Sequence, residues 1–260
     1  MAMDTLKITL VQLDIIWENA QSNINHITLL IKDIVNTDII VLPEMFATGF
    51  SMNPDALAHD SYKVGVDFMR AQAQLKECVV CGSLMCFDNG NYYNRFVWMQ
   101  PSGEMVTYDK RHLFTMGDEP KHYSAGKETL IIDYKGWRIR PLICYDLRFP
   151  VWSRNKSNNP FDILLYVANW PSKRVQQWNK LLQARAIENS CFVIGVNRVG
   201  VDGNGFAYSG GSASVDFLGE VEMLTDNVEC LQTIALDKAA LHSFRSQFPV
   251  LLDADDFVVK

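Results

Sequence analysis

The sequence has no excess of basic residues, no long apolar run and few cysteines, and each absence argues against a class of protein. It carries 24 Lys and Arg against 30 Asp and Glu in 260 residues, a formal net charge of −6, and no run of five or more basic residues. Such a chain has no electrostatic footprint for nucleic acid. No apolar stretch approaches the roughly 20 residues that span a bilayer. We therefore expect neither nucleic acid nor a membrane as a partner.

The first residues also lack the basic segment of a secretory signal peptide. Their apolar stretch is broken by Thr9, Gln12 and Asp14, so it predicts a first strand. Six cysteines in a chain of this length, mostly inside strand-like runs, fit reduced thiols better than a disulfide framework. Both features predict a cytoplasmic protein.

Several catalytic and metal-binding motifs are missing as well. The five histidines are scattered along the chain: His26, His59, His112, His122 and His242. They form no His-Glu-x-x-His pair, so we expect no metal and no cofactor. The glycine-rich residues 200–212 fit neither a dinucleotide fingerprint nor a phosphate-binding loop, and no Gly-x-Ser-x-Gly frame supports a serine hydrolase. A flexible hairpin loop is the better interpretation of that segment.

The hydrophobic pattern predicts one α/β domain over residues 1–260, in which the order of elements is repeated. The expected strands of the first half are residues 7–15, 38–45, 78–87, 92–100 and 104–110, and its helices are 23–35 and 62–77. The second half has strands at 137–146, 161–170, 191–200, 210–217 and 229–237 and a helix at 175–190. Two mixed sheets, each covered by helices on one face and stacked through the other, give a four-layer α-β-β-α sandwich. Residues near 240–260 are expected to form a closing helix and tail.

Three reactive side chains stand at the ends of predicted strands, where ligands of α/β sheets gather. They are Glu44, Lys110 and Cys144. A thiol can attack a carbonyl, a carboxylate can take and return protons, and an ammonium can oppose the charge that develops on the carbonyl oxygen. Taken singly, each has a plainer interpretation, because a cysteine at a strand end is usually a small hydrophobe and isolated Glu or Lys residues are usually solvated.

The sequence around these residues resembles the nitrilase superfamily of carbon–nitrogen hydrolases. The segments are "LPEMFATGF" around Glu44, "YDKRHLF" around Lys110 and "CYDLRFP" around Cys144. Lys110 lies 66 positions after Glu44, and Cys144 lies 34 positions after Lys110. The resemblance implies the four-layer sandwich and a Glu-Lys-Cys triad at these positions. It also implies that Glu119, which precedes Gly126, holds the lysine and helps to position substrate. A helix-cap or surface carboxylate is the alternative for Glu119.

A finer resemblance is to the omega-amidase branch, through "CYDLRFPVWSRN", "VANWP" and "WNKLLQARAIEN". Members of this branch deamidate 2-oxoglutaramate or 2-oxosuccinamate, so a small linear amide is the implied substrate and a homodimer the implied assembly. A true nitrilase typically has a Cys-Trp-Glu context at the nucleophile. This chain has Cys144-Tyr145-Asp146, which favours an amide over a nitrile.

The mechanism implied by the resemblance makes Cys144 the nucleophile, Glu44 the general base and then acid, and Lys110 the stabiliser of the oxyanion. We expect the backbone to turn sharply at Cys144, so that the N–H of Tyr145 joins Lys110 in the oxyanion hole. A nearby lysine is also expected to lower the pKa of the cysteine and to raise its thiolate fraction.

Several residues are candidates for binding the substrate. Arg148 either binds a substrate carboxylate with its fork of donors or pairs with Asp146. Lys173 and Arg174 compete for the carboxylate, and Trp170 is expected to form an apolar wall of the pocket. His122 and Tyr123 are expected near the pocket, whereas His112 is expected to have a packing role.

Two other functions remain open at this stage. One is hydrolysis of N-carbamoyl or other linear aliphatic amides by the same triad. The other is a non-enzymatic thiol-dependent module that binds zinc or undergoes redox chemistry through Cys78 and Cys81, although two cysteines three apart on a strand point to opposite faces. Release of ammonia from a substrate panel separates these functions.

Overall fold

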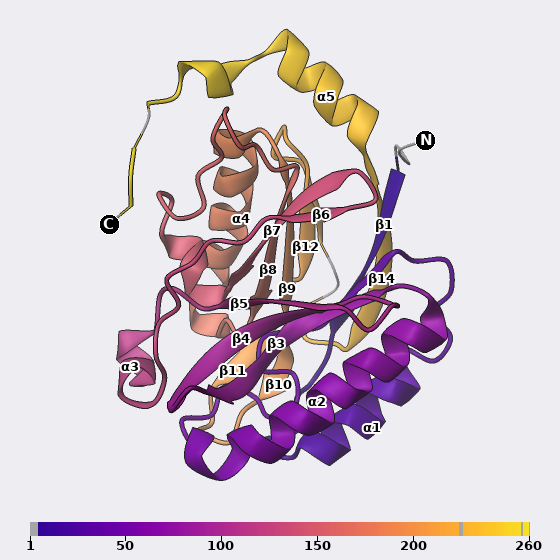
Figure 1. Ribbon diagram of the computed structural model, residues 1–260, viewed down its shortest axis with the longest axis vertical. Helices are drawn as coiled ribbons and strands as arrows, with labels where there is room; N and C mark the ends of the chain where they lie inside the picture. The colour runs from indigo at the N-terminus through magenta and orange to yellow at the C-terminus, as the bar shows by residue number, and fades with distance from the viewer. Residues whose placement is uncertain (1–4, 224–225, 256, 260) are drawn as a thin grey trace.

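The structure is a computed structural model that describes residues 5–223, 226–255 and 257–259. In this part of the chain, two six-stranded sheets dominate the fold (Figure 1). The first sheet has the order β14 (Cys230–Asp237), β1 (Thr5–Gln12), β2 (Ile39–Val41), β3 (Val79–Asp88), β4 (Asn91–Met99) and β5 (Met105–Asp109). The second has the order β13 (Val221–Met223), β12 (Ala213–Val215), β9 (Phe192–Asn197), β8 (Ile163–Ala168), β7 (Trp137–Ile143) and β6 (Ile132–Tyr134). β10 (Val199–Val201) and β11 (Ala207–Ser209) form a separate two-stranded ribbon.

The two sheets share one pairing pattern, as the repeated order of elements predicts. In the first sheet β1, β2 and β3 are parallel neighbours, and the flanking pairs are antiparallel. In the second sheet β7, β8 and β9 are the parallel neighbours, again flanked by antiparallel pairs. Both sheets are therefore mixed, and the carboxyl ends of their parallel strands are the places where polar side chains can gather.

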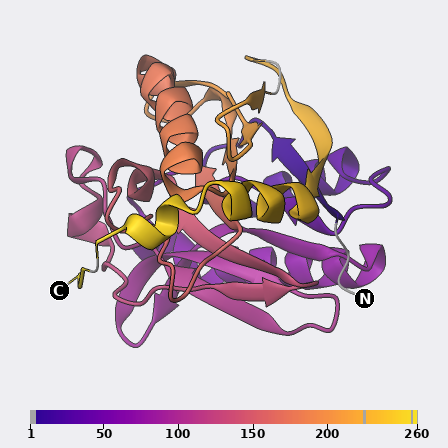
Figure 2. The ribbon, with the colours of Figure 1, turned by 90° about the horizontal axis from the view of Figure 1, so that it is seen from above.

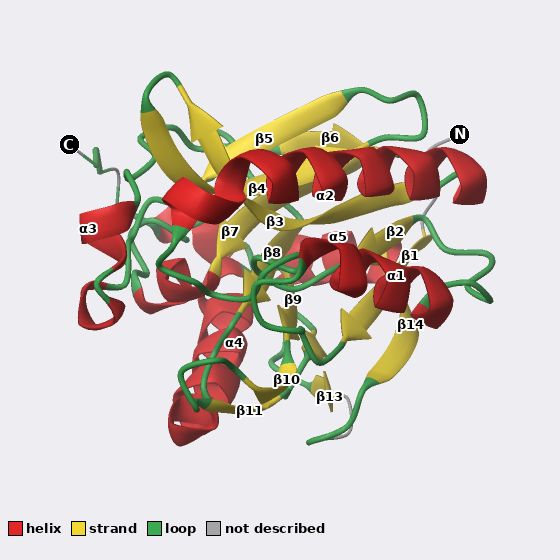
Figure 3. Ribbon diagram, turned by 90° about the horizontal axis from the view of Figure 1, so that it is seen from below, coloured by secondary structure: helices red, strands yellow, loops and turns green. Residues whose placement is uncertain are grey.

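Successive side chains of the strands pack on opposite faces of the sheet, and this alternation produces the layers. In β1, Leu10 packs in the large core that includes the strands of the second sheet, while its neighbour Val11 packs in the cluster that includes Ile27 of α1 (Ala20–Leu30) and Met69 of α2 (Pro54–Lys76). Successive strand residues point to opposite faces, so one face of the sheet meets the other sheet and one meets the helices. Figure 3 shows α1 and α2 side by side over the first sheet.

The outer face of the second sheet is covered by α4 (Val175–Asn189). A Cβ added to Gly195 of β9 would stand 2.8 Å from atoms of both Trp178 and Leu182 of α4, so the glycine permits this close approach. The four-layer α-β-β-α sandwich is confirmed. Two short elements near the strand ends, α3 (Glu119–His122) and the 3-10 turn η1 (Thr115–Gly117), follow β5.

The segment after β14 closes one end of the sandwich. α5 (Lys238–Gln247) lies across that end in Figure 2 and is followed by the 3-10 turn η4 (Val250–Asp253). Arg245 of α5 pairs with Asp162 and donates to the carbonyls of Phe161 and Ser190, so it ties the helix to the second sheet. Among the described residues, no helix combines the length and apolarity needed to cross a membrane.

Candidate active site

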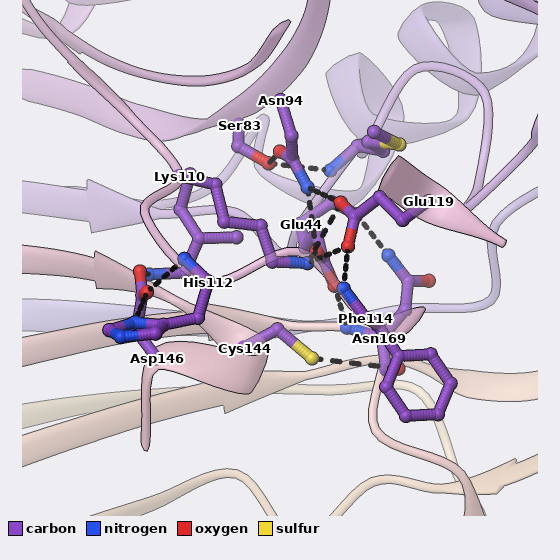
Figure 4. Close-up of polar contacts among 12 residues, drawn as sticks. Glu44, Ser83, Asn94, Lys110, His112, Phe114, Glu119, Cys144, Asp146 and Asn169 are labelled. Carbon is purple, nitrogen blue, oxygen red and sulfur yellow. Dashed lines mark hydrogen bonds and ion pairs between the residues drawn. The ribbon is translucent and has the colours of Figure 1, made fainter. Parts of the chain in front are cut away.

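The three reactive residues predicted from the sequence come together where their strands end (Figure 4). Lys110 directly follows β5, Cys144 directly follows β7, and Glu44 lies just beyond β2. The Lys110 ammonium Nζ is 2.9 Å from Glu44 Oε1, and both side chains are fully buried. The chain brings these groups together because the ends of parallel and neighbouring strands meet at one edge of the two sheets.

Glu119 belongs to the same buried cluster. Its two carboxylate oxygens each lie 3.0 Å from Lys110 Nζ, and Oε2 also accepts the N–H of Phe114 at 2.6 Å. The side chain is fully buried, so the alternative of a surface carboxylate is wrong. Lys110 thus lies between two carboxylates, and its single ammonium forms an ion pair with each of them.

Burial and charge set the protonation of this cluster. Burial alone would lower the pKa of Lys110, but Glu119 and Glu44 outweigh it and raise the pKa, so the ammonium is held in its charged form. Burial raises the pKa of Glu119. Burial, reinforced by the neighbouring Glu44, also raises the pKa of the Cys144 thiol well above its usual range, although Lys110 acts in the opposite direction. Lys110 thus lowers the pKa of Cys144, as expected, but burial and Glu44 outweigh this effect, so the net shift disfavours the thiolate.

The backbone turns sharply at Cys144, as expected. Cys144 has φ of 44°, a left-handed conformation that costs energy for a residue with a Cβ. It begins the 3-10 turn η2 (Cys144–Arg148), in which Tyr145 follows it and also lines the pocket. Strain of this kind persists only where the surroundings hold it in place, and here the holding residue is Asp146.

Asp146 braces the turn from inside the protein. Its carboxylate accepts the N–H of Ile143 at 3.0 Å, the N–H of His112 at 3.0 Å and the hydroxyl of Tyr108 at 2.8 Å. Arg148 is not one of its partners, so the alternative in which Asp146 neutralises that arginine is wrong. The His112 ring lies against Asp146 and stacks on a phenylalanine, which gives it the packing role expected of it.

A cavity of about 240 Å³ opens beside the triad. Glu44, Lys110 and Cys144 line it together with three residues expected from the sequence: Arg148, Trp170 and Arg174. The Arg148 guanidinium lies 4.9 Å from the centroid of the Trp170 ring, and that of Arg174 lies 5.2 Å from the Phe114 ring. Among the described residues, neither arginine forms an ion pair, so both guanidinium groups can meet a ligand carboxylate, although Asp202 lines the same cavity.

Three expected neighbours of the pocket lie elsewhere. His122 is exposed on α3, and Lys173 does not line the cavity. Tyr123 follows α3 in an extended conformation, its ring packs with Met45 and Met85, and its hydroxyl donates to the Ser51 carbonyl at 2.7 Å. Since the tyrosine points into the protein, neither it nor His122 contacts the space beside Cys144.

Sequence reasoning missed several polar residues of this site. Asn94 of β4 donates to Glu44 Oε1 at 2.8 Å, and the backbone N–H of Asn169 donates to Glu44 Oε2 at 2.7 Å. Asp202, from the segment interpreted as a flexible loop, lines the cavity and accepts the Tyr208 hydroxyl at 2.8 Å. The sequence offered little signal at Asn94, because the same strand also carries Asn91 and Arg95.

The two cysteines of the Cys-x-x-Cys segment do not form a site. Cys78 packs in the cluster beneath α1 and α2, whereas Cys81 packs between the two sheets, so they lie on opposite sides of the first sheet. Burial raises the pKa of Cys78 to about 11 and raises that of Cys81 well above its usual value. The alternative of a shared zinc or redox site loses its geometric basis.

A four-layer sandwich with Glu, Lys and Cys at adjoining strand ends defines the carbon–nitrogen hydrolase class. Residues 7–246 match the family described as carbon-nitrogen hydrolase, and the chain belongs to this family. It is 45% identical to an omega-amidase, YafV, of Yersinia enterocolitica over 99% of this chain and 100% of the relative. It is 32% identical to a 2-oxoglutaramate amidase of Bacillus subtilis over 95% and 96% of the two chains.

A solved structure from Xanthomonas campestris shares the fold closely. It is a CN-hydrolase superfamily protein with an arsenic adduct in its active site, and it matches with a TM-score of 0.96 and 43% identity. The match covers 99% of this chain and all of that protein. The fold and the family thus agree with the expectation drawn from the three sequence segments.

Proposed function

We propose that the protein is an omega-amidase that hydrolyses 2-oxoglutaramate or 2-oxosuccinamate to the dicarboxylate and ammonia. The observation that carries this proposal is the cavity beside Cys144. It is lined by the buried pair of Glu44 and Lys110 and by two arginines without an ion-pair partner, Arg148 and Arg174. Such a cavity fits a short molecule with an amide at one end and a carboxylate at the other. The names of the two relatives described above support the same reaction.

In the proposed mechanism, Glu44 removes the proton from the Cys144 thiol as the sulfur attacks the amide carbon. The raised pKa of the thiol makes such a base necessary, because little thiolate exists at rest. Glu44 then returns the proton to the nitrogen as the carbon–nitrogen bond breaks, and ammonia leaves. A water molecule, deprotonated by Glu44, attacks the resulting thioester, and the thiol is restored with its proton as the carboxylic acid departs.

Lys110 opposes the charge on the carbonyl oxygen during both attacks. Its ammonium has three N–H donors and lies near three carboxylate oxygens, one of Glu44 and two of Glu119. In this proposal the two Glu119 oxygens share one donor, which leaves one donor for the substrate. The N–H of Tyr145 is the second donor in this proposal. Glu119 acts by holding Lys110 through two oxygens, so the ammonium does not need to reorganise when negative charge appears.

Ammonia release by wild type and two cysteine variants tests the proposal. Cys144→Ala should abolish release from 2-oxoglutaramate while the fold persists, because the change removes the attacking atom and little else. Cys81→Ala removes a buried thiol outside the cavity and should keep substantial turnover. A folded Cys144→Ala protein with near-normal release, or activity only on N-carbamoyl compounds in wild type, would contradict the proposed function.

Three further expectations remain predictions. The apolar stripe of α4 fits a homodimer interface as well as a core-facing helix, and size-exclusion chromatography with light scattering decides between dimer and monomer. The buried thiols of Cys78, Cys81, Cys86 and Cys191 form no disulfide, which is consistent with work in the cytoplasm. The joining of both sheets in one large apolar core supports a single domain.

A further inference from the structure

The two oxygens of the Glu44 carboxylate accept different numbers of hydrogen bonds (Figure 4). Oε1 accepts from Asn94 Nδ2 at 2.8 Å and from Lys110 Nζ at 2.9 Å. Within the ranges that the structure describes, Oε2 accepts a protein donor only from the N–H of Asn169, at 2.7 Å. A carboxylate oxygen has about two acceptor positions. Oε1 is therefore filled, and Oε2 keeps one position open.

Asn169 links the open oxygen to the Cys144 thiol. Asn169 contacts both groups, since its N–H binds Glu44 Oε2 and its carbonyl oxygen is 3.8 Å from the Cys144 sulfur. The Glu44 carboxylate is also close enough to the thiol to contribute to its raised pKa. Oε2 is thus the oxygen with the free acceptor position, and it shares Asn169 as a neighbour with the sulfur.

A chain of hydrogen bonds fixes the orientation of Asn94. The N–H of Met45 donates to Ser83 Oγ at 2.9 Å, and the Ser83 hydroxyl donates in turn to Asn94 Oδ1 at 2.8 Å. The Asn94 amide nitrogen must then face the carboxylates, and it lies 2.8 Å from Glu44 Oε1 and 3.4 Å from Glu119 Oε1. Ser83 and Asn94 are fully buried, so water does not compete for these contacts.

We propose that Asn94, oriented by Ser83, is a positioning residue that fills Oε1 of Glu44 and thereby assigns proton exchange with Cys144 to Oε2. The inference rests on the proposed function in one respect, the use of Glu44 as the base. Without the Asn94 amide, Oε1 gains an open acceptor position and the carboxylate can rotate toward Lys110. The carboxylate also loses a hydrogen-bond donor that favours its charged form.

The test compares Asn94→Ala with Ser83→Ala and with a matched control, Asn155→Ala. Asn155 is also buried and hydrogen-bonded, to Asn189 and Phe161, but it does not line the cavity. Because a hydrogen bond to a charged group is being removed, Asn94→Ala should lower kcat by about tenfold to a hundredfold. KM should change little, since Asn94 does not line the cavity. The acid limb of the kcat profile should move up by about one pH unit.

Ser83→Ala should move the acid limb in the same direction by a smaller amount, and it tests the proposal if Asn94→Ala does not fold. Asn155→Ala should lower the melting temperature without moving the acid limb. If Asn94→Ala behaves like Asn155→Ala, losing stability while its pH profile overlays that of wild type, Asn94 is purely structural and the proposal is overturned.

Labelling of Cys144 by iodoacetamide, followed by peptide mass spectrometry across pH, separates this inference from the proposed function. The labelling reaction needs the thiol proton to leave but needs no amide substrate. An upward shift of the labelling profile in Asn94→Ala supports the positioning role even if wild type releases no ammonia from any amide. Superimposed labelling profiles of Asn94→Ala and wild type overturn it, whatever the amidase assay shows.

Discussion

Replacing Arg148 by glutamine should reduce the preference for a carboxylate-bearing amide. The change removes a guanidinium that lines the cavity and lies over Trp170, while it keeps a polar side chain in the turn after Cys144. A hydrogen bond to a charged group contributes about 1.5–3 kcal/mol, which corresponds to roughly tenfold to a hundredfold in kcat/KM. Arg148 is half-buried, so solvent screens part of its interaction with the substrate carboxylate. We therefore expect a loss in kcat/KM near the lower end of this range, about tenfold.

The assay measures kcat/KM for 2-oxoglutaramate and for an uncharged amide of the same length. Arg174→Gln is measured in parallel because Arg174 is the second unpaired cation of the cavity. Lys173→Gln is the matched control, since it removes the same charge one position away without touching the cavity. Circular dichroism establishes that each variant is folded.

The expected result is a selective loss. Arg148→Gln or Arg174→Gln should cost the acid substrate about tenfold and the neutral amide less than about threefold, while Lys173→Gln leaves both nearly unchanged. Two outcomes refute the reasoning: a wild type with no preference for the carboxylate-bearing amide, or an existing preference that neither arginine variant narrows. The anionic-substrate proposal would then be abandoned, and only a thiol-dependent amidase would remain.

Three other predictions concern the buried cluster. Lys110→Met should lower ammonia release by about a hundredfold to a thousandfold through loss of an oxyanion donor, and it should lower the melting temperature because two buried carboxylates lose their cation. Gly126→Ala should reduce both stability and turnover, measured by thermal unfolding and ammonia release, because its Cβ would stand 2.1 Å from the Asp109 carbonyl oxygen, next to the lysine. In Glu44→Gln, iodoacetamide labelling of Cys144 should be slow at neutral pH and accelerate above the ordinary thiol pKa of 9.0, since burial keeps the pKa high; labelling that is already fast at neutral pH would contradict the need for a base.

The fold was predictable because the sequence patterns that indicate its strands and helices are local, and they recur in the same order in both halves of the chain. Apolar strands such as residues 161–170 and 191–200 indicate a sheet covered on both faces, and β8 and β9 are buried along their whole length. The three segments around Glu44, Lys110 and Cys144 then identified the family, and the match over residues 7–246 confirms it.

Element boundaries were predicted less well. β2 covers only Ile39–Val41, so Glu44 lies beyond the strand instead of ending it. α2 begins at Pro54, eight residues before the predicted start at residue 62. A proline in the first turn of a helix, where its missing N–H is not needed, was a start signal that the apolar periodicity alone did not include.

The inner polar residues of the site were not predictable from spacing. Asn94 contacts Glu44, which is 50 positions away, and Asn169 contacts the same glutamate from 125 positions away. The first contact depends on the order of strands within one sheet and the second on how the two sheets are stacked, whereas sequence periodicity reports only which face of its own element a residue occupies. The misplacement of Tyr123 has the same origin, because closeness in sequence to Glu119 does not determine where a ring packs.

The raised pKa of the Cys144 thiol means that the proposed reaction needs a base next to the sulfur. A thiolate could form before the attack only if the attraction of Lys110 outweighed the other effects on the sulfur. Two carboxylates already pair with that ammonium, and burial disfavours a charged sulfur. In the proposed mechanism, Cys144 therefore loses its proton during the attack, to Glu44 as the base. In the proposed mechanism, a residue that fixes the Glu44 carboxylate affects the rate without touching substrate, which is the role we propose for Asn94, a residue that does not line the cavity.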